Sequence, residues 1–150
     1  MGPRLRRRPV AVLALLAVPW SVQTFAGGRP PTYVFAWGLV NADPFGVTFL
    51  WDFLVRYTRG LPPYIVAWPI SAGCYLLALA SAACGRALGR EDVRVTAGLL
   101  AAAGVAQLTL ARGFSVQPGR TAWPLGTVAC WAVAWWIYAR SSPAPDRRDA

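Results

Sequence analysis

Histidine and lysine are absent from this chain of 150 residues, and all 15 basic residues are arginine. The side chain that most often serves as a general base is therefore missing. No CxxC pair occurs, and Cys74, Cys84 and Cys130 lie in uncharged stretches, where a thiol usually behaves as a small apolar group. We predict no catalytic residues, no metal site and no cofactor.

Charge is also absent from long parts of the chain. The 15 arginines and six acidic residues all lie outside residues 9–28, 60–85, 95–111 and 121–139. A bilayer core about 30 Å thick is crossed by roughly 17–25 mostly apolar helical residues. Lipid selects helices because the backbone polar groups must be bonded within the chain. The pattern predicts an all-α polytopic membrane protein, with a four-helix transmembrane bundle in a single domain, residues 1–150.

The transmembrane helices are expected at about 10–25, 63–84, 95–111 and 122–139, followed by a disordered cytoplasmic tail at 141–150. None of these spans contains an ionisable side chain apart from cysteine and tyrosine. Pumps, proton-coupled transporters and voltage sensors carry charged groups inside the membrane. Their absence argues against that class of protein.

The arginines are divided unequally between the two ends of the expected bundle. Residues 1–8, 86–94 and 140–150 hold ten of them, whereas 29–59 and 112–120 hold five. Cytoplasmic loops carry the arginine excess, so we expect a multi-pass protein of the cell membrane with both termini in the cytoplasm. The net charge of +9 is dispersed over the loops, so nucleic acid is not an expected partner.

The first span has an alternative interpretation. The basic start and the apolar run that follows it are typical of a secretory signal, and Thr24-Phe25-Ala26 is an acceptable cleavage site. The apolar run continues past Pro19 and Trp20 without a small-x-small end. We therefore favour a retained first span over cleavage.

Residues 27–60 form the outer segment between the first two spans. Within it, residues 44–59 are predicted to form one amphipathic helix at the membrane interface. Its polar side chains fall on one narrow stripe: Thr48, Asp52, Arg56 and Arg59. The favoured role is a lid over the helix ends. The alternatives are a binding surface formed by Asp52, Arg56, Arg59 and Arg112, and a fifth, broken span.

The fourth span has a face of small residues. Gly126, Cys130 and Ala134 recur every four positions, and small residues allow membrane helices to approach closely. We predict that this face packs against the third span.

Several runs resemble a known family: FAWG, RYTRGLP, AWP, GREDVRVTAGLL, GFS and PGRTAWPLGT. The chain resembles a family of small uncharacterised integral membrane proteins of halophilic archaea over most of its length. The resemblance implies a membrane protein and implies no mechanism.

Three functions remain open from the sequence. The leading hypothesis is a non-enzymatic structural or accessory subunit of a membrane assembly, with the lipid bilayer and a membrane protein or a second copy as partners. The second is a transporter or channel for a small solute. The third is an intramembrane enzyme that acts on lipid head groups through Asp43, Asp52 and nearby arginines.

Overall fold

The computed structural model describes residues 3–57, 59–89 and 92–141. The helices are α1 (Pro3–Ala14), α2 (Leu50–Tyr57), the 3-10 helix η1 (Pro63–Val66), α3 (Ala67–Leu88), α4 (Val93–Ser115) and α5 (Leu125–Ala139). The strands are β1 (Ser21–Phe25), β2 (Thr32–Val34), β3 (Gly38–Asn41), β4 (Gly46–Phe49) and β5 (Arg120–Trp123).

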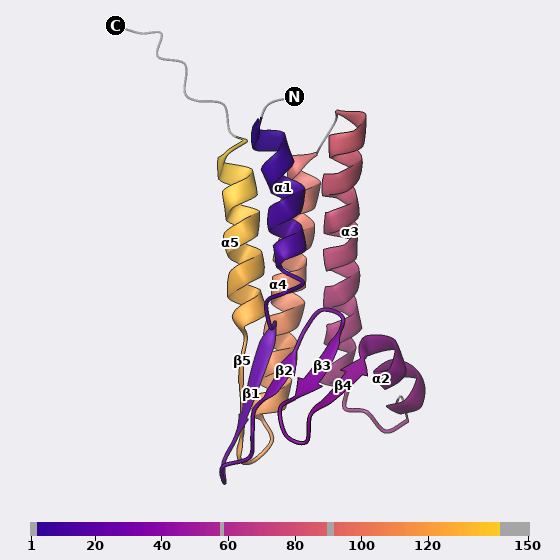
Figure 1. The fold of residues 1–150 in the computed structure, drawn as a ribbon, viewed down its shortest axis with the longest axis vertical. Helices are drawn as coiled ribbons and strands as arrows, with labels where there is room; N and C mark the ends of the chain where they lie inside the picture. Colours follow the sequence, from indigo (N-terminus) through magenta and orange to yellow (C-terminus); the bar gives the residue numbers. More distant parts are fainter. Residues whose placement is uncertain (1–2, 58, 90–91, 142–150) are drawn as a thin grey trace, which may run out of the picture.

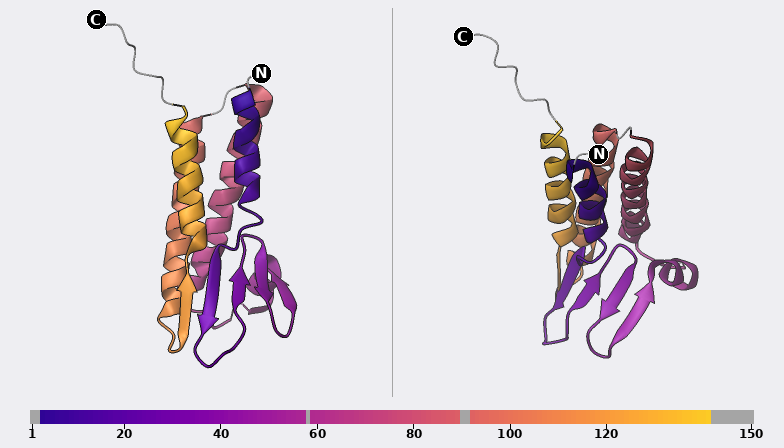
Figure 2. Two further views of the ribbon diagram at one scale, coloured as in Figure 1. Left: turned by 60° about the vertical axis from the view of Figure 1, so that its left-hand side comes forward. Right: turned by 45° about the horizontal axis from the view of Figure 1, so that its top comes forward.

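Four helices, α1, α3, α4 and α5, stand side by side, and the five strands form a sheet at one end of them (Figure 1). The start of α1, the end of α3, the start of α4 and the end of α5 lie at the opposite end. The two further views in Figure 2 also show the sheet below α1 and α5. The molecule therefore has a helical half and a sheet half.

The sheet is antiparallel throughout, with the strand order β4-β3-β2-β1-β5. Strands β1 to β4 follow one another along the chain, whereas β5 comes from after α4 and pairs with β1. Side chains alternate between the two faces of a strand, and in β1 this alternation buries Ser21 and Gln23. The sheet packs mainly on α4, through β5 and β1, and Trp68 of α3 lies in the same group of buried side chains as Val34 of β2.

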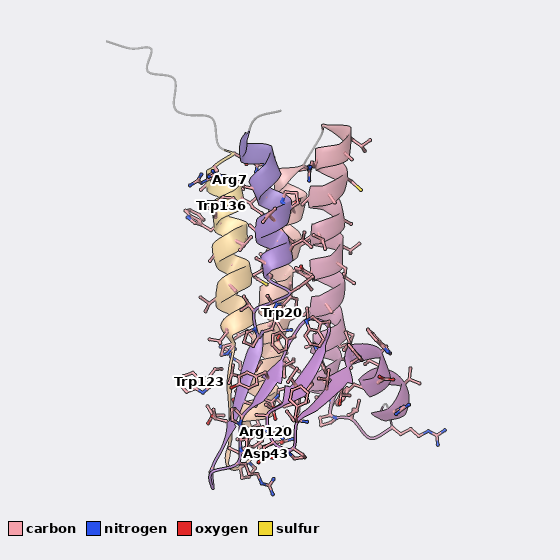
Figure 3. All side chains as sticks on the ribbon, viewed as in Figure 1. Arg7, Trp20, Asp43, Arg120, Trp123 and Trp136 are labelled. Atoms are coloured by element: carbon pink, nitrogen blue, oxygen red, sulfur yellow. The ribbon has the colours of Figure 1, made fainter. Side chains whose placement is uncertain are left out.

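Two groups of buried apolar side chains correspond to the two halves. The first joins the four helices and includes Tyr75, Leu100, Cys130 and Ile137. The second lies between the sheet, η1 and the adjoining ends of α3 and α4: Val34, Ile65, Trp68, Leu110, Ala111, Phe114 and Ala122. Trp20, in the segment between α1 and β1, belongs to the first group and lies at the junction of the halves (Figure 3).

The expected all-α four-helix transmembrane bundle is wrong, because the chain contains this five-stranded sheet. Two helical stretches, Pro63–Leu88 and Val93–Ser115, are long and apolar enough to cross a membrane, which is weak evidence by itself, and Leu125–Ala139 is shorter. The expected spans at 63–84 and 95–111 fall inside the two long stretches. The physical reason for the error is that an uncharged sequence suits a buried strand as well as a helix.

The boundaries of the other expected helices differ accordingly. Residues 10–25 comprise the end of α1, a connecting segment and β1, and residues 122–139 begin in β5 before α5 starts. The single helix expected at 44–59 is replaced by β4 and the eight-residue α2. In each case residues with a high strand propensity, such as Val22 and Thr121, pair with another strand. Apart from Ser141, the expected tail at 141–150 lies outside the described residues.

Candidate functional site

The charged residues of the predicted outer binding surface lie at two separate edges of the sheet. Asp52 and Arg56 are on α2, which packs beside the edge strand β4, and the exposed Arg59 follows α2. Arg112 is in the last turn of α4, and it lines a pocket that Ala122 of β5 also lines, at the opposite edge. Asp52, Arg56 and Arg59 are close in the sequence, and the structure does not bring Arg112 to them.

The β4–α2 edge carries exposed apolar side chains instead of a continuous polar stripe. We call these five residues the aromatic patch: Phe45, Val47, Phe49, Trp51 and Val55. Phe45 is 79% exposed, and the rings of Phe49 and Trp51 are stacked with their centroids 4.6 Å apart. Exposed aromatic groups in such a cluster are typical of an interface with a membrane or with another protein.

The end of α1 is bonded by aromatic side chains from three other segments. The Nε1 of Trp20 donates to the carbonyl of Leu15 at 2.9 Å, and the hydroxyl of Tyr75 donates to the carbonyl of Val12 at 2.8 Å. The Nε1 of Trp37 donates to Leu16 at 3.0 Å. Val12 lies in the last turn of α1, and Leu15 and Leu16 directly follow the helix. These donors therefore bond the backbone at the point where α1 ends, where carbonyls need partners from outside the helix.

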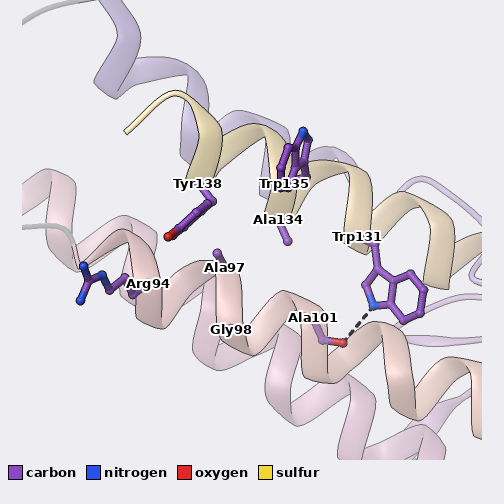
Figure 4. A pocket seen from close by; sticks show the side chains of 8 residues that line it. All are labelled: Arg94, Ala97, Gly98, Ala101, Trp131, Ala134, Trp135 and Tyr138. Atoms are coloured by element: carbon purple, nitrogen blue, oxygen red, sulfur yellow. Dashed lines mark hydrogen bonds between the residues drawn. The ribbon is translucent and has the colours of Figure 1, made fainter. Parts of the chain in front are cut away.

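A groove runs between α4 and α5 on the outside of the helical half, with a volume of about 440 Å³ (Figure 4). Its lining residues are Arg94, Ala97, Gly98, Ala101, Trp131, Ala134, Trp135 and Tyr138. The Nε1 of Trp131 donates to the carbonyl of Ala101 at 3.1 Å and so holds the indole against α4. The described residues of the groove are small on its α4 side and mostly large and aromatic on its α5 side, and one of them, Arg94, is charged.

All three residues of the predicted small-residue face are buried, but they have different neighbours. The amide of Gly126 donates to the carbonyl of Trp20 at 2.7 Å, and a Cβ at Gly126 would lie 2.8 Å from the Cα of Trp20. Gly126 therefore makes its closest approach to the segment after α1, and not to α4 as expected. Cys130 and Ala134 lie in the core of the helical half.

Polar side chains inside the molecule follow two patterns. The hydroxyl of Ser71 donates to the carbonyl of Ala103 at 2.9 Å, and that of Thr127 donates to Gly104 at 2.8 Å, so both join neighbouring helices. In contrast, four buried polar atoms have no hydrogen-bond partner among the described residues: Ser21 Oγ, Gln23 Nε2, Gln107 Nε2 and Gln107 Oε1. Gln107 lies on the same stripe of α4 as Leu110 and Ala111, which face the sheet.

The described part of the chain holds no group of three or more histidine, cysteine, aspartate or glutamate side chains that could bind a metal ion. Cys74, Cys84 and Cys130 are free thiols. Two features were not expected from the sequence: the groove, and the hydrogen bonds that Trp20, Trp37 and Tyr75 donate at the end of α1. The spacing of Gly98 and Ala101 on α4 is the one signal that could have indicated the groove.

A family model described as a domain of unknown function (DUF8050) matches residues 2–147. The chain belongs to this family. No curated protein and no solved structure matches the chain. The match therefore establishes the family and leaves the activity to be argued from the geometry.

Proposed function

We propose that this chain is an integral membrane protein in which α3 and α4 cross the bilayer. The shorter α1 and α5 pack against them, and the sheet with α2 lies at the outer surface. We further propose that it acts as a non-enzymatic structural or accessory subunit of a membrane assembly.

The observation that carries the proposal is the outer surface of the helical half. Large apolar side chains are exposed on all four of its helices: Val10, Leu13, Ile70, Leu76, Leu77, Val95, Val105, Val128, Trp131 and Trp135. Soluble monomers rarely expose a contiguous apolar surface of more than a few hundred Å². We call these ten residues the apolar belt, and lipid is the solvent that suits it.

The dimensions support the same conclusion. α3 has 22 residues and α4 has 23, so at 1.5 Å per residue each is about 33–35 Å long. This length exceeds the hydrocarbon core of about 30 Å. The sheet has two open edges, and open edges exposed to lipid do not occur in the hydrocarbon region. The sheet is therefore assigned to the water interface, where the aromatic patch meets the lipid head groups.

The orientation follows from the arginines. Among the described residues, the helix ends opposite the sheet carry seven arginines: Arg4, Arg6, Arg7, Arg8, Arg86, Arg94 and Arg140. The sheet end carries five: Arg29, Arg56, Arg59, Arg112 and Arg120. Figure 1 shows that these two sets of helix ends lie at opposite ends of the molecule. Because cytoplasmic segments hold the arginine excess, we assign this arginine-rich end to the cytoplasm and the sheet to the outer side.

An accessory role suits the way in which polar groups are used. Within the helices, Ser71 and Thr127 are bonded to carbonyls of α4, as in helix–helix packing and not in catalysis. Native purification with mass spectrometry tests this role. A protein partner that co-elutes in a fixed ratio would support it, whereas the isolated chain alone would contradict it.

Membrane insertion is tested by alkaline carbonate extraction of cell membranes. We expect the chain to stay in the pellet and to require detergent for solubilisation. A monodisperse chain in the aqueous supernatant would overturn the proposal, since the apolar belt would then face water.

A second candidate function, passage or binding of a small polar solute, is favoured by one observation. The carboxamide of Gln107 is fully buried, and neither of its polar atoms has a hydrogen-bond partner among the described residues. Such groups are costly unless a water or solute bonds them. Glycerol uptake by liposomes, followed by light scattering, distinguishes the candidates. Uptake that is lost in Gln107→Leu would favour the solute pathway, and uptake no faster than in empty liposomes would exclude glycerol transport.

A further inference from the structure

The groove between α4 and α5 has the form of a site for a chain-like apolar ligand. Ala97 and Ala134 are buried at its base, while Trp135 is 71% exposed at its side. A Cβ at Gly98 would meet no atom within 4 Å, so the surface above Gly98 is open. From Arg94 to Ala101 the helix rises by about 10 Å, which gives the groove a charged end and an apolar length.

Among the described residues, Arg94 is the only charged one that lines the groove. It stands in the first turn of α4, where Asp92 caps the helix by accepting from the amides of Arg94 and Val95 at 2.9 Å and 3.4 Å. Another arginine at this end is engaged elsewhere, because the guanidinium of Arg140 stacks on the Trp136 ring at 5.1 Å. Figure 4 shows Arg94 at one end of the groove and Trp131 at the other.

We propose that this groove binds one anionic phospholipid of the cytoplasmic leaflet, and this inference rests on the proposed membrane location. The phosphate meets the guanidinium of Arg94. An acyl chain lies over Gly98 and Ala101, beside the rings of Trp131 and Trp135. A basic group at the mouth of an apolar groove between membrane helices is complementary to a lipid with a charged head and an apolar tail.

The test uses the full-length protein in nanodiscs that contain equal amounts of phosphatidylglycerol and phosphatidylcholine. Native mass spectrometry then counts the lipids that remain bound after release into detergent. We expect one retained lipid, with phosphatidylglycerol preferred. Arg94→Gln should lower this preference about fivefold, as expected for the loss of one basic group near an anionic head group.

Arg86→Gln is the matched control, because Arg86 is an exposed arginine in the last turn of α3 and does not line the groove. Gly98→Leu should fill the groove and lower retention of both lipids. Gly73→Leu is its control, since a Cβ at Gly73 of α3 also meets no atom within 4 Å. Equal losses in Arg94→Gln and Arg86→Gln would overturn the proposal, because the charge of the whole end would then attract the lipid.

Two further outcomes would also overturn it. A wild-type protein that is in the membrane fraction but retains no lipid would exclude the lipid site and leave the proposed function intact. A dimer that is lost in Gly98→Leu would instead assign the groove to a second copy. Failure of the proposed function is seen separately, as a chain that is extracted by carbonate.

Discussion

The helical half and the sheet half of this chain consist of similarly uncharged segments, yet they satisfy their backbone in different ways. In α3 and α4 the amides beyond the first turn bond within their own helix, and the side chains are left to pack or to face the surroundings. In the sheet, β1 pairs with β2 on one side and with β5 on the other. The helices therefore tolerate lipid around them, whereas the sheet needs its partners in place and water at its edges.

At the junction of the two halves, Trp20 connects helices to the sheet. Trp20 is hydrogen-bonded to three neighbouring segments: its amide donates to the carbonyl of Val34 in β2, its carbonyl accepts from the amide of Gly126 in α5, and its Nε1 donates to the carbonyl of Leu15 next to α1. Its ring meets Tyr75 of α3 edge-on, with the centroids 5.3 Å apart. One buried aromatic residue thus connects a helix end, a strand and two further helices.

The largest expected effect tests whether the helical half and the sheet half have different surroundings. Leu77→Arg introduces a charge in the apolar belt of α3, and we expect insertion to become less favourable by about 3 kcal/mol. Phe45→Arg is the control, because Phe45 is also exposed but lies in the sheet half, which the proposed orientation assigns to the water interface. The measurement is the fraction of protein inserted in a translocon assay. Equal effects of the two changes would mean that the helices and the sheet have the same surroundings.

The second prediction concerns the junction itself. Gly126→Ala places a Cβ against the backbone of Trp20, and we expect the free energy of unfolding to fall by about 2 kcal/mol from overpacking. Gly98→Ala is the control, since its Cβ meets no atom within 4 Å and alanine is the better helix former. Thermal unfolding in detergent measures both. A Gly126→Ala variant as stable as wild type would show that Trp20 can move away freely.

The third prediction tests the hydrogen bonds that aromatic side chains donate at the end of α1. Tyr75→Phe removes the hydroxyl that donates to Val12, and we expect a loss of about 1 kcal/mol in the free energy of unfolding. Tyr138→Phe serves as control, because Tyr138 is an exposed residue of α5. Urea titration in detergent gives both values. A larger loss for Tyr138→Phe would contradict the role assigned to Tyr75.

The smallest effect is expected within the helical half. Ser71→Ala removes one bond between α3 and α4, and such bonds between membrane helices contribute about 0.6 kcal/mol on average. Thr109→Val should change less, because that hydroxyl bonds the Val105 carbonyl of its own helix at 3.1 Å. Van't Hoff analysis of thermal unfolding resolves the order. A reversed order would show that Ser71 is not holding the two helices together.

The sequence predicts the helical half better than the sheet half, and particular residues show why. The uncharged stretches at 60–85 and 95–111 coincide with most of α3 and α4, since both the apolar composition and the helical bonds are local. The sequence Ser21–Phe25 is equally uncharged but forms β1. Its short length and its β-branched and aromatic side chains favour a strand, although they do not name a partner.

The candidate site also combines residues that the sequence shows with an arrangement that only the fold shows. The small residues of α4 and the aromatic residues of α5 are each visible in the sequence, but the groove exists only where the two helices lie against each other. The sequence assigns both Arg112 and Asp52 to the outer segments of the chain. In the structure, however, β3, β2 and β1 separate the two edges of the sheet at which they lie. Sequence spacing alone carries no information on that separation.

By itself the sequence determined which stretches avoid charge and where the arginines collect, because these properties depend on composition alone. The tertiary structure alone decided that β1 pairs with β5, where Thr24 and Thr121 lie 97 positions apart, and that Gly126 meets Trp20. A strand or a close glycine contact depends on a distant backbone segment that supplies the missing partner. Folding of the whole chain is what brings that segment into reach.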